Sequence, residues 1–290
     1  MKVVEPEPSS RPSFQSKVRD GMSFWSRLRQ RTEFVRKLPQ SIELITTRLD
    51  LLEIAAGIQP NELPEVLEVE IPVGEPVGCC LGSEDELYLA FENRFRSSAS
   101  VATKAKRYLS MIEGFCGDRQ EGVVVVDIGC GRGEFLDGVV ASGFRGIGVE
   151  TNLAEVRALR ERGRVVFEGD ANAYLRQCPD DSLGVVTAFH VVEHMNSAYF
   201  LEFISLLGRK IASEGMVILE TPNPMCREVD YSFYHDLTHI RPYPRETMSF
   251  YLEAAGFTRL RAVYSSPCAP ELRGLHPERD YLDYAIVASR

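Results

Sequence analysis

The chain has 290 residues, of which 44% are hydrophobic and 26% are charged. This composition is ordinary for a folded globular protein and excludes a fibrous repeat or a wholly disordered chain. The 33 basic and 42 acidic residues give a formal net charge of −9, which argues against a protein that tracks nucleic-acid phosphates over its whole surface.

Cysteine usage and the start of the chain indicate a cytoplasmic protein. The seven cysteines are an odd number and none forms a C-x-x-C pair, so we expect reduced thiols and neither a zinc site nor a disulfide framework. Residues 1–10 are acidic and rich in proline, and they lack the layout of a signal peptide. No apolar run reaches the length needed to span a bilayer.

The N-terminal region is expected to hold a tail and a helical extension. Residues 1–22 are rich in proline and serine and are expected to be a disordered tail. Within residues 23–59, six aliphatic residues follow heptad spacing: Val35, Leu38, Ile42, Ile45, Leu49 and Leu52. Pro39 interrupts this seam, so two helices or a kink are expected. The seam is compatible with a helical hairpin packed on the main domain, or with helices that join copies of the chain into a homo-oligomer.

Charge is segregated along the same region. Basic residues dominate residues 17–37, where Phe24, Trp25 and Leu28 are interleaved with them. Such a segment suits either a solvated helix face or peripheral contact with an anionic surface such as the inner membrane. Residues 60–83 follow as an acidic linker that contains prolines and no basic residue.

From residue 84 to the end, helices and strands are predicted to alternate. Helices are predicted over 84–115, 135–141, 153–162, 172–178, 198–211 and 245–255, and strands over 123–127, 146–150, 165–167, 183–189, 216–220, 257–264 and 284–288. When strands alternate with helices, the strands pair in parallel and the helices form right-handed crossovers between them. A doubly wound α/β sheet is therefore predicted. The last two strands have no helix between them and should form an antiparallel pair at the sheet edge.

The first strand ends in an acid followed by three alternating glycines, D-I-G-C-G-R-G over residues 127–133. Glycines allow positive φ and close approach of a ligand, and the following helix supplies free amides. The spacing differs from the G-x-G-x-x-G of dinucleotide sites, and the carboxylate of Asp127 suits a cationic amino group better than a pyrophosphate. Glu150 closes the second strand, where an acid can accept from ribose hydroxyls, and Asp170 closes the third, where it could accept from an adenine amino group. Adenine, ribose and a charged amino acid together describe S-adenosylmethionine.

With these features in register, residues 87–290 resemble the class I S-adenosylmethionine-dependent methyltransferases. The resemblance implies an enzyme with a Rossmann-like seven-stranded sheet and S-adenosylmethionine as its cofactor. It implies that the glycines hold the methionine part, Glu150 the ribose, and Asp170 with Ala171 the adenine. The cofactor-binding residues that it implies are Arg96, Asp127, Gly129, Cys130, Gly131, Gly133, Glu150, Thr151, Asp170, Ala171 and His190.

Four further segments are similar to methyltransferases of bacterial O-antigen and related polysaccharides, some of which terminate chains by methylating a terminal sugar or its phosphate. They are F-E-N-R-F-R-S at 91–97, H-V-V-E-H at 190–194, E-T-P-N-P at 220–224 and D-L-T-H-I-R-P at 236–242. The chain departs from that family at Ser97, where glycine is usual, and at Leu237, where proline is usual. The resemblance implies a saccharide or sugar-phosphate acceptor, and glycosyltransferases of the same pathway as partners.

Four of the five histidines fall in the loops after the fourth and fifth strands. A sugar hydroxyl needs a base as it attacks, and histidine suits that role near neutral pH, whereas a phosphate acceptor needs cations instead. His194, His239 and His235 are the candidate catalytic bases, each with the alternative of bracing its own loop. Substrate contacts are expected from Glu193, Asn223, Tyr234 and Arg241.

Two other functions stay open at this point. One is an O- or N-methyltransferase of a small metabolite such as a quinone precursor, which should present an apolar pocket. The other is a non-catalytic scaffold with a methyltransferase fold, against which the intact glycines and strand-end acids argue. No matched trio of magnesium ligands is evident around Asp236 and Asn223, so methyl transfer without a metal is expected.

Overall fold

A computed structural model describes residues 87–88, 91, 98–119, 122–274 and 276–290. The expected tail, helical extension and acidic linker, together with Arg96, lie outside these residues. Within the described part, no helix combines the length and the apolar character needed to cross a membrane.

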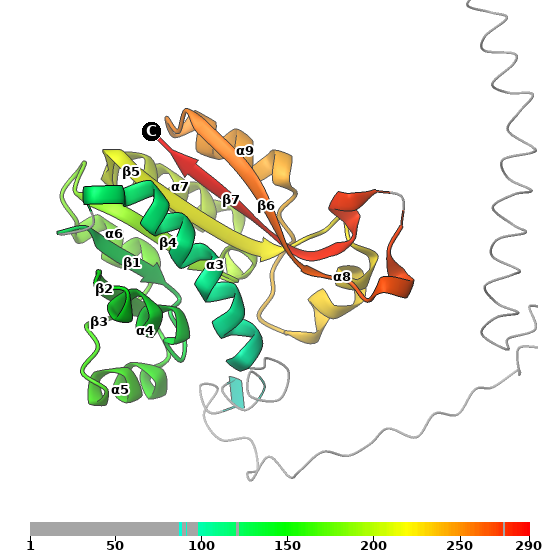
Figure 1. The fold of residues 1–290 in the computed structure, drawn as a ribbon, viewed down its shortest axis with the longest axis horizontal. Coiled ribbons are helices and arrows are strands. Elements are labelled where there is room, and N and C mark those ends of the chain that lie inside the picture. Colours follow the sequence, from blue (N-terminus) through cyan, green and yellow to red (C-terminus); the bar gives the residue numbers. More distant parts are fainter. Residues whose placement is uncertain (1–86, 89–90, 92–97, 120–121, 275) are drawn as a thin grey trace, which may run out of the picture. The chain divides into compact units, whose positions relative to one another are not determined.

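A seven-stranded sheet forms the centre of the fold, with strand order β3-β2-β1-β4-β5-β7-β6 (Figure 1). The strands are β1 (Val124–Ile128), β2 (Arg145–Glu150), β3 (Val166–Glu168), β4 (Leu183–Phe189), β5 (Ile211–Pro222), β6 (Arg259–Pro267) and β7 (Tyr281–Ser289). The first five pair in parallel, whereas β7 is antiparallel to both β5 and β6. The predicted Rossmann-like sheet is confirmed. Its order reverses between β1 and β4, the switch point at which doubly wound sheets bind ligands.

The antiparallel direction of β7 brings the start of this strand to the functional edge of the sheet. Glu220 of β5 pairs with Ala285, and Pro222 pairs with Asp283. The first residues of β7 therefore lie beside the carboxyl ends of the parallel strands, although they are far from them in the sequence.

Helices cover both faces of the sheet (Figure 1). One face carries α3 (Ser98–Cys116), α4 (Glu134–Ala141) and α5 (Leu153–Glu161), and the other carries α6 (Ala171–Gln177), α7 (Ser197–Lys210) and α9 (Arg245–Ala254). Successive strand residues point to opposite faces, so Val125 packs in the cluster that includes α3 and α4, while Val126 packs in the cluster that includes α7 and α9. This two-sided burial explains why β1 begins with three consecutive valines.

Several elements differ from the sequence-based expectation: β6 ends at Pro267 rather than 264, and β7 begins at Tyr281 rather than 284. Strand β5 begins at Ile211 rather than 216, because its pairing with β4 continues across a register shift between Leu183 and Val185. The helix α8 (Arg227–Ser232) was not predicted, since six residues are too few for helical periodicity to show. It lies beyond the carboxyl ends of the strands, next to the 3-10 turn η3 (Phe233–His235). The other 3-10 turns are η1 (Gly117–Arg119), η2 (Val192–His194), η4 (Pro270–Leu272) and η5 (Pro277–Arg279).

Candidate active site

A cavity of about 570 Å³ opens at the carboxyl ends of the parallel strands. Its walls come from the turn after β1, the start of α4, the ends of β4 and β5, the start of β7, and residues of α3 and α8. A concave site of this size at the switch point of an α/β sheet is where a small organic ligand is expected.

The glycine turn, residues 129–133, forms one side of the cavity. Gly129, Gly131 and Gly133 have φ of 66°, 48° and 81°, in the region that favours glycine. A Cβ at Gly129 would lie 2.5 Å from Cγ2 of Val191, and one at Gly133 would lie 2.3 Å from Cδ2 of Leu159. A Cβ at Gly131 would meet no atom within 4 Å, and Gly131 lines the cavity. The first and third glycines are thus required by packing, while the second leaves space for a ligand.

The carboxylate of Glu150 ties the end of β2 to the glycine turn. It accepts hydrogen bonds from the backbone amides of Gly131 at 2.8 Å, Thr151 at 2.8 Å and Asn152 at 2.9 Å. The second and first strand ends are therefore joined through one acidic side chain. A ligand hydroxyl that reached this carboxylate would exchange with those amides.

Asp170 lies at the end of the third strand and caps α6. Its Oδ1 accepts from the amide of Ala173 at 2.8 Å and from the hydroxyl of Tyr199 at 2.5 Å. Burial acts to raise the pKa of Asp170, but these hydrogen bonds outweigh it and lower that pKa. Asp170 is therefore an ionised hydrogen-bond acceptor at neutral pH, and the buried Ala171 follows it directly.

Asp127 is a buried acid on the floor of the cavity. Its side chain is 2% exposed and accepts a hydrogen bond from Oγ1 of Thr187 at 2.8 Å. Burial raises the pKa of Asp127 to about 7, although the Thr187 hydrogen bond acts in the opposite direction. The charge of this carboxyl group is therefore poised to respond to a cation that enters the cavity.

The opposite side of the cavity is a charged wall made of Lys104, His190, Glu220 and Asp283. Lys104 Nζ lies 2.6 Å from Asp283 Oδ2 and 3.6 Å from Glu220 Oε1. His190 Nε2 lies 3.3 Å from Glu220 Oε1 and 3.6 Å from Asp283 Oδ1. Two cations and two carboxylates, from α3, the loop after β4, β5 and β7, thus meet in one cluster.

Glu220 is the anchor of the charged wall. Its Oε2 accepts hydrogen bonds from the Tyr108 hydroxyl and from Ser265 Oγ, the latter at 2.9 Å. Burial acts to raise the pKa of Glu220, but His190, Lys104 and Tyr108 together lower it to about 2. Lys104 and Tyr108 are four residues apart on α3, so both side chains lie on the helix face that meets this carboxylate.

His190 stands between the charged wall and a second buried acid. It is one of the few non-glycine residues with positive φ, at 56°. Its Nδ1 lies 3.1 Å from Oε1 of the fully buried Glu193, whose Oε2 accepts from Thr221 Oγ1 at 3.0 Å. Burial acts to lower the pKa of His190, but Asp283, Glu193 and Glu220 raise it to about 9. Glu193 therefore supports His190 from behind.

The three histidines predicted to be catalytic are not among the described residues that line the cavity. The chain turns through η2 between His190 and His194, so it is His190 that reaches the cavity. The rings of His194 and His239 pack together, with centroids 4.7 Å apart. His235 is exposed and packs edge-to-face on Tyr231.

The remaining residues predicted to contact substrate also lie away from the cavity lining. Asn223 is buried, and its side-chain amide donates to the carbonyls of Glu278 and Tyr281, both at 2.8 Å. Arg241 donates to Ser197 Oγ at 3.0 Å. Tyr234 is 73% exposed. Asn223 thus pins a loop near the site, whereas Tyr234 and Arg241 lie on the surface.

The sequence analysis did not predict the residues that build the charged wall around His190: Lys104, Tyr108, Glu220 and Asp283. Glu220 carried a usable signal, because it is an acid at a strand end, as Glu150 and Asp170 are. Asp283 could be placed only once the register of β7 against β5 was known. No pattern in the sequence indicates that α3 packs beside Glu220 and Asp283.

Comparison with known proteins gives a consistent picture. Residues 99–262 match a family model described as a methyltransferase domain. A probable S-adenosylmethionine-dependent methyltransferase of Mycolicibacterium smegmatis is 29% identical over 133 residues, which are 46% of this chain and 51% of that protein. The chain therefore matches about half the length of this curated relative.

Solved structures are similar over a larger share of the chain. A S-adenosylmethionine-dependent methyltransferase from Archaeoglobus fulgidus is 30% identical, with a TM-score of 0.62, over 70% of this chain and 99% of that one. A methyltransferase from Thermotoga maritima, described as a possible histamine N-methyltransferase, is 18% identical with a TM-score of 0.52, over 71% of this chain and 96% of that one. At that identity, the second likeness concerns the fold alone.

Proposed function

The chain belongs to the methyltransferase-domain family, and we propose that it transfers the methyl group of S-adenosylmethionine to a hydroxyl group of a saccharide. Its domain is that of a S-adenosylmethionine-dependent methyltransferase. Our proposal concerns the identity of the methyl acceptor and the roles of individual residues.

The methyl donor would occupy the side of the cavity formed by the glycine turn. The open space at Gly131 leaves room for the methionine part, and Asp127 would pair with its ammonium group. Glu150 would exchange its bonds to backbone amides for bonds to the ribose hydroxyls. Asp170 and Ala171, at the next strand end, would hold the adenine.

The charged wall is the observation that carries the choice of acceptor. The lining of the whole cavity carries one acid more than bases: the acids are Asp127, Glu134, Glu220 and Asp283, and the bases are Lys104, Arg132 and His190. A phosphate would be repelled by this excess of acids, whereas sugar hydroxyls can donate hydrogen bonds to carboxylates. The rest of the lining includes Phe135, Phe189, Phe233 and Leu282, an apolar surface of the kind that a quinone precursor would need, so the test below includes that class of acceptor. A neutral hydroxyl acceptor is the best match.

Asp283 is the proposed proton acceptor. Lys104 holds its Oδ2 at 2.6 Å, so Oδ1 is the oxygen on the side of His190. Transfer forms a bond between the acceptor oxygen and the methyl carbon and breaks the bond between this carbon and the sulfonium sulfur. The hydroxyl proton passes to Asp283, and S-adenosylhomocysteine leaves. The rest of the rate enhancement would come from holding the methyl donor and the acceptor in line.

The polysaccharide context rests on the four sequence segments that resemble O-antigen methyltransferases. Surface-polysaccharide biosynthesis and contact with glycosyltransferases or with the inner membrane are therefore proposals from that resemblance. Oligomerisation through residues 23–59 is likewise a proposal, since these residues lie outside the described ones.

The proposal is tested by measuring S-adenosylhomocysteine release with a panel of acceptors. The panel contains neutral sugars and oligosaccharides, sugar phosphates, nucleotide sugars and a catechol that mimics a quinone precursor. Turnover with neutral saccharides is the expected result. Turnover with sugar phosphates or with the catechol alone would contradict the proposed acceptor while leaving the family assignment intact.

A further inference from the structure

Two histidines and one glutamate form a cluster behind the charged wall. One nitrogen each of His194 and His239 and one carboxylate oxygen of Glu193 all lie within 4.8 Å of one another. The three side chains come from two segments far apart in the sequence, the turn η2 and the loop that follows η3. They are outside the lining of the cavity, so the proposed methyl transfer does not account for them.

The protonation of His239 is fixed by its neighbour. Its Nδ1 lies 2.7 Å from the carbonyl oxygen of Phe233, and a carbonyl can only accept, so Nδ1 carries the hydrogen. In the neutral ring, Nε2 then holds a lone pair. This nitrogen is buried, with only 6% of the side chain exposed, and it makes no hydrogen bond to the described residues; Asp236 Oδ2 lies 3.8 Å from it, beyond hydrogen-bond distance. An unpartnered buried lone pair is costly and requires an explanation.

A second chain of hydrogen bonds orients His194. Thr238 Oγ1 lies 2.5 Å from Asp236 Oδ1 and 2.8 Å from His194 Nδ1. The threonine has one hydroxyl hydrogen, and the ionised Asp236 can only accept, so the hydroxyl donates to Asp236 and accepts from Nδ1 of His194. In the neutral ring, Nε2 is again the lone-pair nitrogen. Hydrogen bonds that fix Nδ1 in this way are typical of metal-binding histidines.

Glu193 supplies an anionic ligand in the same place. It is fully buried, and His190 and Thr221 each engage one of its oxygens. A carboxylate oxygen has two lone pairs, so each can accept one further bond. The hydrogen bonds from His190 and Thr221 stabilise the charged form of this carboxylate.

We propose that Glu193, His194 and His239 bind a divalent transition-metal ion, with Zn²⁺ as the best fit. Two imidazole nitrogens and one carboxylate are a common ligand set for zinc, with water in the fourth position, whereas Mg²⁺ and Ca²⁺ prefer oxygen ligands alone. Zinc bond lengths of about 2.0–2.2 Å place tetrahedral ligand atoms about 3.4 Å apart. The three ligand atoms, which lie within 4.8 Å of one another, would close to that separation when the ion binds. The lone pair of His239 would then have its partner.

The ion would reinforce a contact that the backbone already makes. The amides of Ile240 and Arg241 donate to the carbonyl oxygen of Glu193 at 2.8 and 3.2 Å, which joins the two segments. A metal ion would add a connection between side chains next to these backbone hydrogen bonds and hold the loop that follows η3 against η2. Because Glu193 also contacts His190, this connection would fix the back of the charged wall. The inference is independent of the acceptor proposed above.

The test uses the full chain, freed of its affinity tag and of metal, and measures Zn²⁺ and Co²⁺ binding. Retention of one Zn²⁺ per chain after gel filtration, with a rise in Tm, is the expected result. His239→Asn should weaken Zn²⁺ binding by at least about 100-fold, since loss of supporting hydrogen bonds alone costs 10–100-fold. His235→Ala is the matched control from the adjacent turn η3, and it should bind Zn²⁺ as the wild type does.

Cobalt distinguishes this site from the buried pair Cys226 and Cys268, whose sulfurs are 3.3 Å apart. The expected Co²⁺ spectrum has visible d–d bands and no sulfur charge-transfer band. His194→Asn provides a second ligand variant if His239→Asn does not fold. The inference is overturned if the wild type retains no Zn²⁺, if both ligand variants bind as the wild type does, or if Co²⁺ shows a sulfur band that Cys226→Ser removes.

Discussion

The glycine turn and the charged wall face each other across one cavity, yet they are built in different ways. The turn presents backbone amides and three glycines within five consecutive residues, and its acids follow at successive strand ends. The wall collects single side chains from positions 104 to 283. Local backbone conformation therefore creates the glycine turn, and tertiary packing creates the charged wall. Substitutions in the two regions should have different effects: those in the glycine turn should weaken binding of the methyl donor, and those in the charged wall should slow turnover.

The largest effect is expected from Asp283→Asn. If Asp283 takes the proton of the acceptor, kcat should fall by roughly 10²–10⁴-fold, the usual contribution of general-base catalysis. The Kd for S-adenosylmethionine should stay nearly unchanged. Steady-state release of S-adenosylhomocysteine and calorimetric binding measure the two quantities.

Asp230→Asn is the control for this substitution, since Asp230 is an exposed acid on the nearby α8. It should leave both kcat and Kd at wild-type values. A variant of Asp283 that turns over at the wild-type rate would remove Asp283 from the mechanism.

A matched pair of glycines tests the other side of the cavity. Gly131 and Gly163 both have positive φ, 48° and 74°, and a Cβ at either would meet no atom within 4 Å. Substitution of either glycine by alanine should therefore lower the free energy of unfolding by a similar amount, about 1–2 kcal/mol, because alanine is strained at positive φ. Gly131 lines the cavity, whereas Gly163 lies in the turn between α5 and β3.

Gly131→Ala should therefore weaken S-adenosylmethionine binding by at least tenfold, or about 1.4 kcal/mol, and Gly163→Ala should not. Calorimetry gives the Kd, and urea unfolding verifies that the strain is equal. Equal Kd values for the two variants would mean that the methyl donor does not approach the backbone at Gly131.

The sequence predicted the glycine turn and its acids because their geometry is local. Alternating glycines after a β-branched strand indicate a strand-turn-helix unit, and Glu150 and Asp170 mark the ends of the next two strands. The positions of strands and helices followed from the same periodicities, and most agree with the structure within two residues. The prediction for the start of β5 was wrong because a register shift interrupts the pattern of this strand.

The charged wall could be predicted only in part because it depends on register and helix orientation. The loop after β4 was expected to supply a cofactor contact, His190, and a candidate base, His194, and of these two only His190 lines the cavity. The two differ only in which side of η2 they reach, which a sequence does not encode locally. Lys104 and Tyr108 meet Glu220 because α3 packs across β5 and β7, and this contact spans more than 100 residues.

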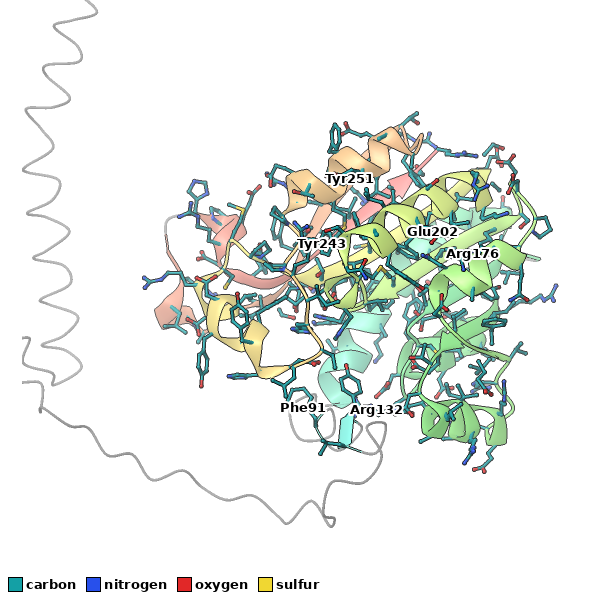
Figure 2. The ribbon with its side chains drawn as sticks, turned by 180° about the vertical axis from the view of Figure 1, so that it is seen from behind. Phe91, Arg132, Arg176, Glu202, Tyr243 and Tyr251 are labelled. Atoms are coloured by element: carbon teal, nitrogen blue, oxygen red, sulfur yellow. The ribbon has the colours of Figure 1, made fainter. Side chains whose placement is uncertain are left out.

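Stability should also differ between buried and exposed charges. Tyr108→Phe removes a hydrogen bond to the buried, ionised Glu220, and such bonds contribute about 1.5–3 kcal/mol. Figure 2 shows Arg176 and Glu202 side by side on α6 and α7, where they form an exposed ion pair at 2.7 Å. Arg176→Met should change stability little, because solvent screens such pairs.

Urea unfolding at pH 7 measures both variants. A smaller loss for Tyr108→Phe than for Arg176→Met would show that the buried network on the charged wall is not the more stabilising of the two. The comparison favours the exposed pair, since Tyr108→Phe removes one hydrogen bond to a carboxylate and Arg176→Met removes two, while both keep most of the side-chain volume.

The smallest expected effect is the change in S-adenosylmethionine affinity with pH near neutrality, which depends on the ionisation of Asp127. Its pKa of about 7 lies above the ordinary value of 3.8 because the group is buried. The folded state therefore holds this proton more tightly than the unfolded chain does, so the contribution of Asp127 to stability falls as pH rises from about 4 to 7. A bound ammonium group favours the ionised form and lowers the pKa.

Binding of S-adenosylmethionine should therefore release a proton below pH 7. The affinity should rise as pH increases toward 7, by up to tenfold per unit, and by only about twofold between pH 7 and 8. Calorimetry in buffers with different ionisation enthalpies measures the released proton, and Asp127→Asn should abolish both the release and the pH dependence. A wild-type affinity that is flat from pH 5 to 8 would mean that the carboxyl group does not pair with the ammonium group, and that the glycine turn binds its ligand through backbone amides alone.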